Sequence, residues 1–244
     1  MLNRSLWFNQ LDLLSIFQIL GELNSIRNAN KQSQNLSVRE RGDRWLNLVH
    51  RISDRTQHFY RNSSDEFERE CNRLLDCGEA LSTQAIYEFL NCLSEEAQTK
   101  ICTSYSTSSF SDLVPTCAID ICMEVWIDLL FDFPSQRLAV YGTLAPGESN
   151  HHILKPILGK WYDGFSVYGN LTTYKGYPFL LLDQIDLKTA QPNIKIKLFS
   201  SSDLPTHFDR IDAFEGEDYQ RVLIPIFDAA GFAIANIYQG IPNG

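Results

Sequence analysis

Apolar positions in the first half of the chain follow a helical period. They recur at steps of three and four residues over residues 6–23 and 38–60, which predicts two amphipathic helices. The polar stretch 28–37 predicts a loop between them. Shorter helices are expected at residues 67–75, 82–93, 94–102 and 117–131. Residues 1–134 are therefore predicted to form an all-α helical domain, whose function the pattern leaves open.

The pattern changes at Phe133-Pro134-Ser135, after which the apolar runs are short and punctuated by Gly and Pro. Residues 194–198 alternate strictly between apolar and lysine side chains, which predicts a half-buried strand. A short helix is expected at 204–214. Further strand segments are expected at 161–174, 179–182, 221–227 and 232–238, the last two as a hairpin. Residues 135–244 are therefore predicted to form a second domain of class α+β with a mostly antiparallel sheet.

A short apolar run at residues 138–141 is followed by Gly142, which is expected to free the backbone for a sharp loop. Pro146-Gly147 predicts a turn, and Ser149 and Asn150 are candidate N-caps for a helix through residue 158. Backbone N–H groups in such a loop can point at an anion. On these local features alone, however, a plain strand-turn-helix connection is favoured over a binding loop.

The composition is that of a soluble globular protein, with 44% hydrophobic and 21% charged residues in 244. Residues 1–136 contain 12 Lys and Arg against 19 Asp and Glu, a net charge of −7, which leaves −2 for residues 137–244. Neither half supplies the clustered cations that phosphate binding needs, so nucleic acid is not an expected partner.

Residues 1–12 lack the apolar core of a signal peptide, and no apolar run reaches about 18 residues. The expected location is cytoplasmic, without membrane association.

Three groups of side chains invite metal or disulfide interpretations. The six cysteines are expected to be reduced core thiols, with a disulfide framework as the alternative, because none forms a Cys-x-x-Cys pair. Four acids spaced four residues apart favour a solvated helix face over a cation site. His151 and His152 are adjacent and favour a helix surface over a metal site. No metal and no cofactor is therefore expected. The cysteines are Cys71, Cys77, Cys92, Cys102, Cys117 and Cys122, and the acids are Asp120, Glu124, Asp128 and Asp132.

Two longer motifs change the interpretation of the second half. "VYGTLAPGESNHH" begins at Val140 and "IDAFEGEDYQR" begins at Ile211, with "GKWYDGFSVYGNL" and "GYPFLLL" between them. In this order, over about residues 137–238, they resemble the γ-glutamylcyclotransferase family, including its γ-glutamylamine and plant AIG2-like relatives. The resemblance implies a small β-barrel flanked by helices. The family's usual leucine before the acid is Ile211 here, and an unusually long region precedes the motifs.

The resemblance also implies roles for named residues. Glu215 occupies the position of the catalytic glutamate, although by its local pattern alone it would be interpreted as a surface acid at a helix end. Its neighbours Asp212, Glu217 and Asp218 are rival carboxylates. A carboxylate at this position can serve in turn as base and acid.

Further positions match the family's substrate site. Tyr141, Gly142, Thr143 and Leu144 match the loop that would hold the glutamyl end of the substrate through backbone N–H groups and the threonine hydroxyl. Tyr219 and Arg221 match a Tyr-x-Arg element, which we assign to the wall and support of the site. Arg221 has the alternative of a surface ion pair with Glu217 or Asp218.

The sequence thus favours an enzyme that cyclises the γ-glutamyl group of a γ-glutamyl-amine or γ-glutamyl peptide to 5-oxoproline and releases the amine. The alternative is a catalytically silent protein that uses the barrel pocket for a small ligand. In either case, the helical region is a candidate surface for a protein partner or for self-association.

Overall fold

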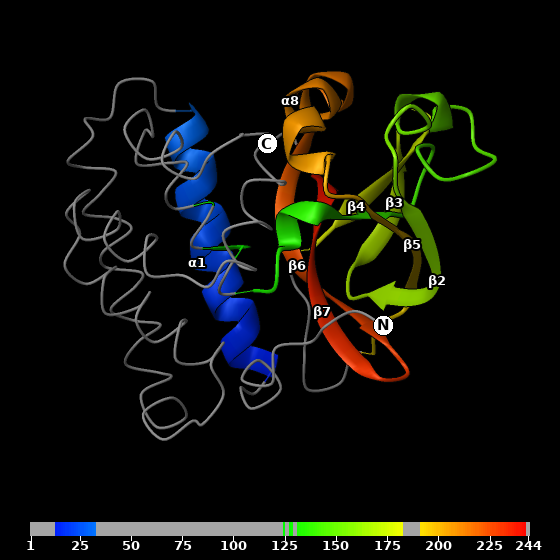
Figure 1. Ribbon diagram of the computed structural model, residues 1–244. Helices are drawn as coiled ribbons and strands as arrows, with labels where there is room; N and C mark the ends of the chain where they lie inside the picture. The colour runs from blue at the N-terminus through cyan, green and yellow to red at the C-terminus, as the bar shows by residue number, and fades with distance from the viewer. Residues whose placement is uncertain (1–12, 33–123, 125–126, 129–130, 183–190, 243–244) are drawn as a thin grey trace, which may run out of the picture. The chain divides into compact units, whose positions relative to one another are not determined.

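The computed structural model describes residues 13–32, 124, 127–128, 131–182 and 191–242 (Figure 1). The chain divides into two compact units, one containing Phe133–Gly244 and the other Asn3–Asp132. We describe each unit by itself. The expected domain boundary near residue 134 stays a prediction, because compactness does not show that either part folds alone.

In the first unit, one long helix is described, α1 at Leu13–Gln32. Its buried residues Ile16, Ile19, Leu20 and Leu23 follow the helical spacing seen in the sequence. The predicted loop at 28–37 is wrong for residues 28–32, which remain helical. The physical reason is that neither proline nor glycine follows Gly21 within α1, and polar side chains alone do not end a helix.

The predicted solvated face is wrong at Asp128, whereas Glu124 is partly solvated. Asp128 is only 1% exposed. Glu124 accepts hydrogen bonds from Arg27 of α1, over 2.7 Å to Nε and 2.9 Å to Nη2. A guanidinium in this bidentate geometry compensates a carboxylate that the sequence pattern assigned to water. Asp120, the six cysteines and the helices expected at 38–60, 67–75, 82–93 and 94–102 lie outside the described residues.

In the second unit, five strands form a closed barrel in the order β1-β5-β2-β6-β7 (Figure 1). Neighbouring strands pair antiparallel, except that β1 and β7 pair in parallel and close the barrel. The expectation of a small mixed barrel is therefore confirmed. The strands are β1 at Arg137–Val140, β2 at Lys160–Val167, β5 at Ile194–Ser200, β6 at Tyr219–Asp228 and β7 at Gly231–Gly240.

The closing hairpin agrees with its prediction. β6 and β7 pair without a register shift from Tyr219↔Gly240 to Asp228↔Gly231. The Asp228 side chain accepts a hydrogen bond from the backbone N–H of Ala230 over 2.8 Å, which stabilises the two-residue loop. Two mainly apolar runs on either side of a short turn allowed this hairpin to be predicted from the sequence, and both strands carry a continuous run of buried residues.

The expected strand at 161–174 is instead two strands in different sheets. β3, at Asn170–Tyr174, leaves the barrel and pairs with β4, at Tyr177–Leu181, in a separate two-stranded sheet. The chain turns at Gly169, where an added Cβ would lie 2.6 Å from a side-chain carbon of Leu180. Its φ of +156° is a backbone conformation that L side chains rarely adopt, which favours glycine at the residue where the sheet changes.

One helix, α8 at Leu204–Glu215, packs on the barrel. Its buried residues Leu204, Phe208 and Ile211 lie at helical spacing and belong to the same apolar cluster as Leu138 and Val140 of β1. This packing fixes the C-terminal end of α8 next to the loop that follows β1.

The helix expected from Ser149 through residue 158 is wrong. Only one short 3-10 turn forms, η3 at His151–Ile153. Asn150 precedes it, but its side chain makes no cap hydrogen bond. A second 3-10 turn, η2 at Pro134–Gln136, precedes β1.

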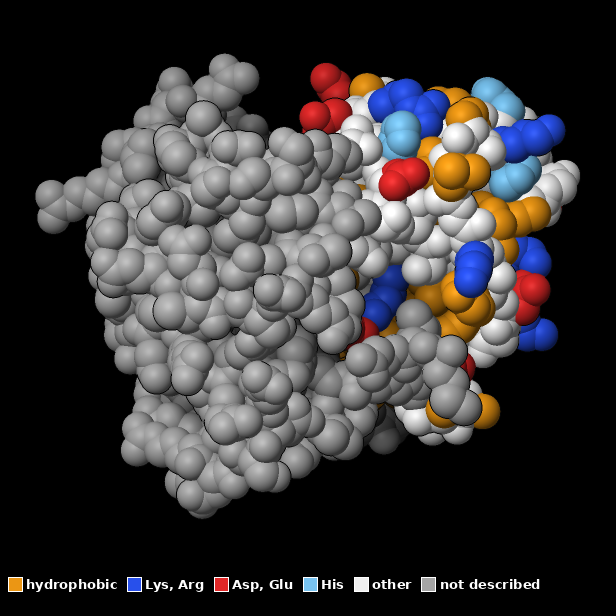
Figure 2. Space-filling view, viewed as in Figure 1, with side chains coloured by type: hydrophobic (Ala, Val, Ile, Leu, Met, Phe, Trp, Pro, Cys, Tyr) orange, Lys and Arg blue, Asp and Glu red, His pale blue; other side chains and the backbone are white. Residues whose placement is uncertain are grey.

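None of the described helices is long and apolar enough to cross a membrane. On the face in Figure 2, basic, acidic and hydrophobic side chains of the described residues are interspersed.

Candidate active site

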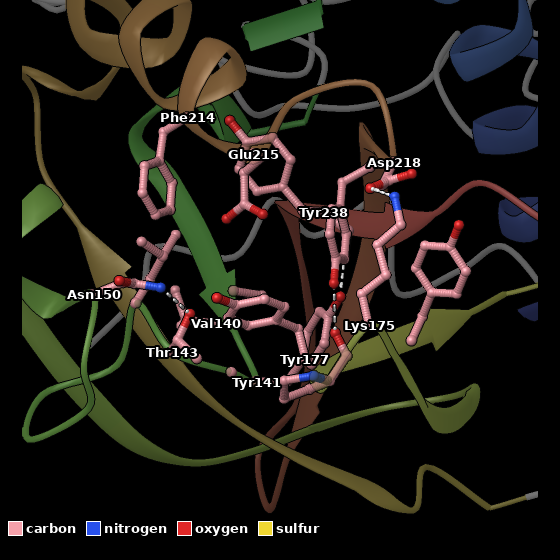
Figure 3. A pocket seen from close by; sticks show the side chains of 16 residues that line it. Val140, Tyr141, Thr143, Asn150, Lys175, Tyr177, Phe214, Glu215, Asp218 and Tyr238 are labelled. Carbon is pink, nitrogen blue, oxygen red and sulfur yellow. Dashed lines mark hydrogen bonds and ion pairs between the residues drawn. The ribbon is translucent and has the colours of Figure 1, made fainter.

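A cavity of about 350 Å³ opens where three elements of the second unit converge. The loop after β1 contributes Tyr141, Gly142, Thr143 and Leu144 to its lining. The end of α8 contributes Phe214 and Glu215, and the hairpin of β3 and β4 contributes a further wall. Figure 3 shows Glu215 pointing into the pocket from the end of the helix, above the side chain of Tyr141. The remaining lining residues are Ala139, Val140, Asn150, Tyr174, Lys175, Tyr177, Pro178, Asp218, Tyr219 and Tyr238.

The loop after β1 offers hydrogen-bond donors to this cavity. Among the described residues, none accepts a hydrogen bond from the backbone N–H groups of Gly142, Thr143 or Leu144. Consecutive backbone N–H groups of this kind form an anion-binding surface without a charged side chain. Gly142 does not adopt a positive φ, so the expectation that it frees the backbone is wrong. A Cβ there would lie 3.5 Å from the Pro178 side chain, which is ordinary contact distance.

Asn150 fixes the shape of the loop. Its backbone N–H donates to the Thr143 carbonyl over 3.0 Å, and its side-chain Nδ2 donates to the Thr143 hydroxyl oxygen over 2.9 Å. A hydroxyl that accepts a hydrogen bond keeps its own proton available for donation. His151 adds support, because its Nδ1 lies 3.1 Å from the Leu144 carbonyl and its ring packs against Trp161.

Tyr141 anchors the start of the loop. Its hydroxyl donates to the Tyr238 carbonyl over 2.8 Å, which links β1 to the last strand. Burial is the main cause that raises the pKa of this hydroxyl above its ordinary value, so it is a neutral donor at physiological pH.

Glu215 has the electrostatics of an acid/base residue. Burial raises its pKa from the ordinary value of 4.5 to about 7, and the negative charge of Asp212 raises it further in the same direction. Glu215 forms no hydrogen bond or ion pair with any of the described residues, so its carboxyl group remains available to a ligand. A carboxyl group with a pKa near 7 can take and give a proton at neutral pH.

The remaining charges at the pocket are paired. Lys175, at the tip of the β3–β4 hairpin, forms an ion pair with Asp218 over 2.8 Å. The Tyr219 hydroxyl donates to the Pro178 carbonyl over 3.0 Å, so its ring forms part of the wall. Arg221 is not among the lining residues and does not form the suggested pair with Glu217 or Asp218. Its Nε lies 2.8 Å from Asp212 instead.

The structure thus brings together the residues that the motifs singled out, with the exception of Arg221. The sequence did not reveal Asn150, Lys175 or Tyr238 as neighbours of the site. Asn150 stood in the first motif and was interpreted only as a helix cap. Lys175 lies far from both motifs, and Tyr238 lies at the edge of the resemblance. Both reach the site only through the tertiary fold. No group of three or more metal-ligating side chains occurs among the described residues.

Comparisons with known proteins give one family match and several similar solved structures. Residues 138–240 match the family described as gamma-glutamyl cyclotransferase, AIG2-like. Three solved structures resemble the chain. YkqA from Bacillus subtilis is 24% identical, with 43% of this chain and 35% of that chain covered and a TM-score of 0.35. An uncharacterized protein from Pyrococcus horikoshii is 24% identical, with 44% and 81% covered and a TM-score of 0.31.

An AIG2-like protein from Mus musculus is 17% identical, with 45% of this chain and 79% of that chain covered and a TM-score of 0.33. The aligned part of the chain spans about a third of the length of YkqA, at 35%. No curated protein matches the chain. Residues 138–240 are therefore a domain of the gamma-glutamyl cyclotransferase, AIG2-like family.

Proposed function

We propose that this domain cyclises the γ-glutamyl group of a γ-glutamyl-amine or γ-glutamyl peptide to 5-oxoproline and releases the amine. The observation that carries the proposal is Glu215, a carboxyl group with a pKa of about 7 that points into a cavity lined by Gly142, Thr143 and Leu144, whose backbone N–H groups donate to none of the described residues. Family membership of residues 138–240 supports a cyclotransferase-like reaction.

The chemistry needs one carboxyl group that acts twice. In its ionised form, Glu215 takes a proton from the α-ammonium group of the substrate, and the freed amine attacks the γ-carbonyl carbon to form the five-membered ring. Protonated Glu215 then gives this proton to the leaving nitrogen as the bond between that nitrogen and the γ-carbon breaks, and the ring nitrogen passes its second proton through Glu215 to the departing amine, which leaves as an ammonium ion. The products are 5-oxoproline and the released amine, and Glu215 is again ionised. The reaction consumes no water and needs no covalent enzyme intermediate.

The loop after β1 supplies the binding side of this reaction. In the proposal, the N–H groups of Gly142, Thr143 and Leu144 and the Thr143 hydroxyl hold the glutamyl end of the substrate. Donors without a formal charge suit this position, because a cation beside Glu215 would lower its pKa and weaken it as a base. Holding the substrate folded on itself lowers the entropic cost of ring closure.

An assay of 5-oxoproline release tests the proposal directly. The full-length protein is incubated with a panel of γ-glutamyl amines, γ-glutamyl dipeptides and glutathione, and the product is quantified by mass spectrometry. Glu215→Gln is expected to reduce turnover by about two to four orders of magnitude, because the amide keeps the shape but cannot exchange the proton. Glu217→Gln is the matched control, since Glu217 is an exposed acid two residues further along.

The outcomes separate the two functions considered for the pocket. Release that is equal in wild type and Glu215→Gln contradicts the assignment of Glu215. If no substrate in the panel is cyclised, calorimetric titration with a non-cyclisable γ-glutamyl analogue distinguishes the remaining cases. Binding without turnover favours a catalytically silent ligand-binding protein, and the absence of binding contradicts the substrate class.

A further inference from the structure

Asp212 lies one helical turn before Glu215 on α8 and is held by side chains from two strands. Its carboxylate accepts hydrogen bonds from Arg221 Nε over 2.8 Å and Nη2 over 3.1 Å, both from β6. The hydroxyl of Tyr238, from β7, donates to the same carboxylate over 2.6 Å. Three donors from the barrel wall therefore fix this acid beside the proposed catalytic acid.

Arg221 brings a positive charge into the wall of the barrel. Its side chain is only 9% exposed, and its guanidinium lies 3.9 Å from the centre of the Phe208 ring. A cation in such a poorly solvated position acts strongly on nearby carboxylates and favours their ionised form. An uncompensated guanidinium here would make Glu215 a weaker base.

The charged and titratable groups around Glu215 come from four elements. Asp212 lies on α8 itself, and Tyr141, Tyr219 and Tyr238 interact with Glu215 from the loop after β1, from β6 and from β7. The pKa values of the three tyrosines are raised, so these groups are neutral at physiological pH. At the rim, Lys175 is paired with Asp218. Each of these two nearby cations, Arg221 and Lys175, therefore has its own carboxylate.

We propose that Asp212 is a positioning residue that holds the Arg221 guanidinium in an ion pair, so that no uncompensated cation acts on Glu215. This inference rests on the proposed function, because it assigns Asp212 a role through the acid/base residue of that reaction. Asp212 touches neither the substrate nor the reacting atoms in this assignment. Its effect is on the proton affinity of Glu215.

The test is the titration of Glu215 itself in the full-length protein. The pKa is measured from the pH dependence of the Glu215 side-chain carboxyl ¹³C resonance, which is assigned by its loss in Glu215→Gln. Asp212→Asn removes the carboxylate charge that pairs with the guanidinium and is expected to lower the pKa of Glu215 by about one unit or more. Arg221→Gln removes the positive charge that pairs with Asp212 and is expected to raise the pKa of Glu215.

Shifts of opposite sign in the pKa of Glu215 in these two variants would distinguish a charge effect from structural damage. Loosening of the wall would admit water to Glu215 and would lower its pKa in both variants. Asp212→Glu keeps the charge and is expected to retain the raised pKa. Asp209→Asn is the matched control, because Asp209 is an exposed acid one turn earlier on the same helix. Its removal is expected to leave the pKa of Glu215 unchanged.

The inference is overturned if Asp212→Asn leaves the pKa of Glu215 unchanged, or if Arg221→Gln lowers it or leaves it unchanged. If Asp212→Asn fails to fold, the Arg221→Gln arm alone decides. The titration needs no turnover, so it can succeed or fail independently of the proposed reaction. Where turnover is present, the acid limb of the pH profile of kcat/KM is expected to shift by the same amount and in the same direction.

Discussion

Asn150 holds Thr143 through two hydrogen bonds, one from its backbone N–H to the Thr143 carbonyl and one from its side chain to the Thr143 hydroxyl oxygen. The second bond leaves the hydroxyl proton of Thr143 available to a ligand. The residue that the sequence indicated as a helix cap therefore organises the binding loop.

The first prediction concerns this pair. Asn150→Ala removes the side-chain bond but keeps the backbone bond, so the loop should lose orientation while the barrel remains folded. We expect the affinity for a non-cyclisable γ-glutamyl analogue to fall about fivefold, the equivalent of one hydrogen bond of about 1 kcal/mol. Calorimetric titration measures this loss. His152→Ala is the control, because His152 is exposed and beyond the loop. An equal loss in both variants would contradict a specific role for Asn150.

The second prediction follows from the raised pKa of Glu215. The folded state binds its proton up to about pH 7, whereas the unfolded chain releases it near pH 4.5, so folding stability should fall as the pH rises between these values. Glu215→Gln removes this dependence. Above neutral pH, we expect the free energy of unfolding of the variant to exceed that of wild type by about 1 kcal/mol or more. This figure is reduced to account for solvent screening at a partly exposed group. Below about pH 4 both states bind the proton, and the difference should disappear.

Urea denaturation of both proteins at several pH values measures this effect. Glu217→Gln serves as the control, because Glu217 is exposed. A wild type that equals Glu215→Gln in stability above neutral pH would show that Glu215 is not held in a poorly solvated site.

The third prediction concerns space beside Gly142. A single Cβ would lie at ordinary contact distance from Pro178, so Gly142→Ala should fold and retain measurable binding. Gly142→Val adds two methyl groups between the loop and the hairpin and is expected to weaken binding of the analogue severely. Calorimetry on the two variants separates these cases. Equal affinity in Val and Ala variants would place the ligand elsewhere in the pocket.

The fourth prediction concerns the end of α8. Gly216 adopts φ 72° and ψ −164°, a combination that is essentially restricted to glycine. Nothing lies within 4 Å of an added Cβ, so the cost of Gly216→Ala would come from the backbone alone. We expect about 1 to 3 kcal/mol of destabilisation, measured by chemical denaturation. Because Glu215 immediately precedes this residue, kcat should fall as well.

The fifth prediction concerns the domain boundary. Asn236 of β7 donates to the carbonyl of Pro134 over 2.8 Å, so the residues before β1 contribute to the second unit. A fragment of residues 133–244 should fold, whereas a fragment of residues 138–244 should be less stable because the buried Asn236 loses an acceptor. Circular dichroism and thermal melting compare the two. An unfolded longer fragment would show that the second unit depends on the rest of the chain.

The sequence predicted those elements whose pattern is local. The alternation in β5, the apolar runs of β6 and β7 and the apolar face of α8 are properties of neighbouring residues, and these elements were found within a few positions. The split of residues 161–174 between two sheets was not predicted. It depends on the pairing of β3 with β4 outside the barrel, which no local pattern reports.

The motifs predicted the residues that line the candidate site. They did not predict the interactions that hold those residues in place. Glu215 and the loop of Tyr141 to Leu144 stand in the two matching stretches. The pairing of Arg221 with Asp212 was missed because sequence proximity favoured Glu217 or Asp218. Only the packing of α8 on the barrel brings the guanidinium to the buried face of the helix.

The pocket can form only after β1 has paired in parallel with β7. Tyr141 and the Tyr238 carbonyl that it binds are 97 residues apart, so this contact closes almost the whole length of the second unit. Such long-range contacts are entropically costly to form and make folding slow. During synthesis, the loop after β1 leaves the ribosome well before β7, the strand to which Tyr141 binds. The pocket can therefore be assembled only after the last strand has left the ribosome, and any truncation within β7 should remove ligand binding even when the motifs remain in the chain.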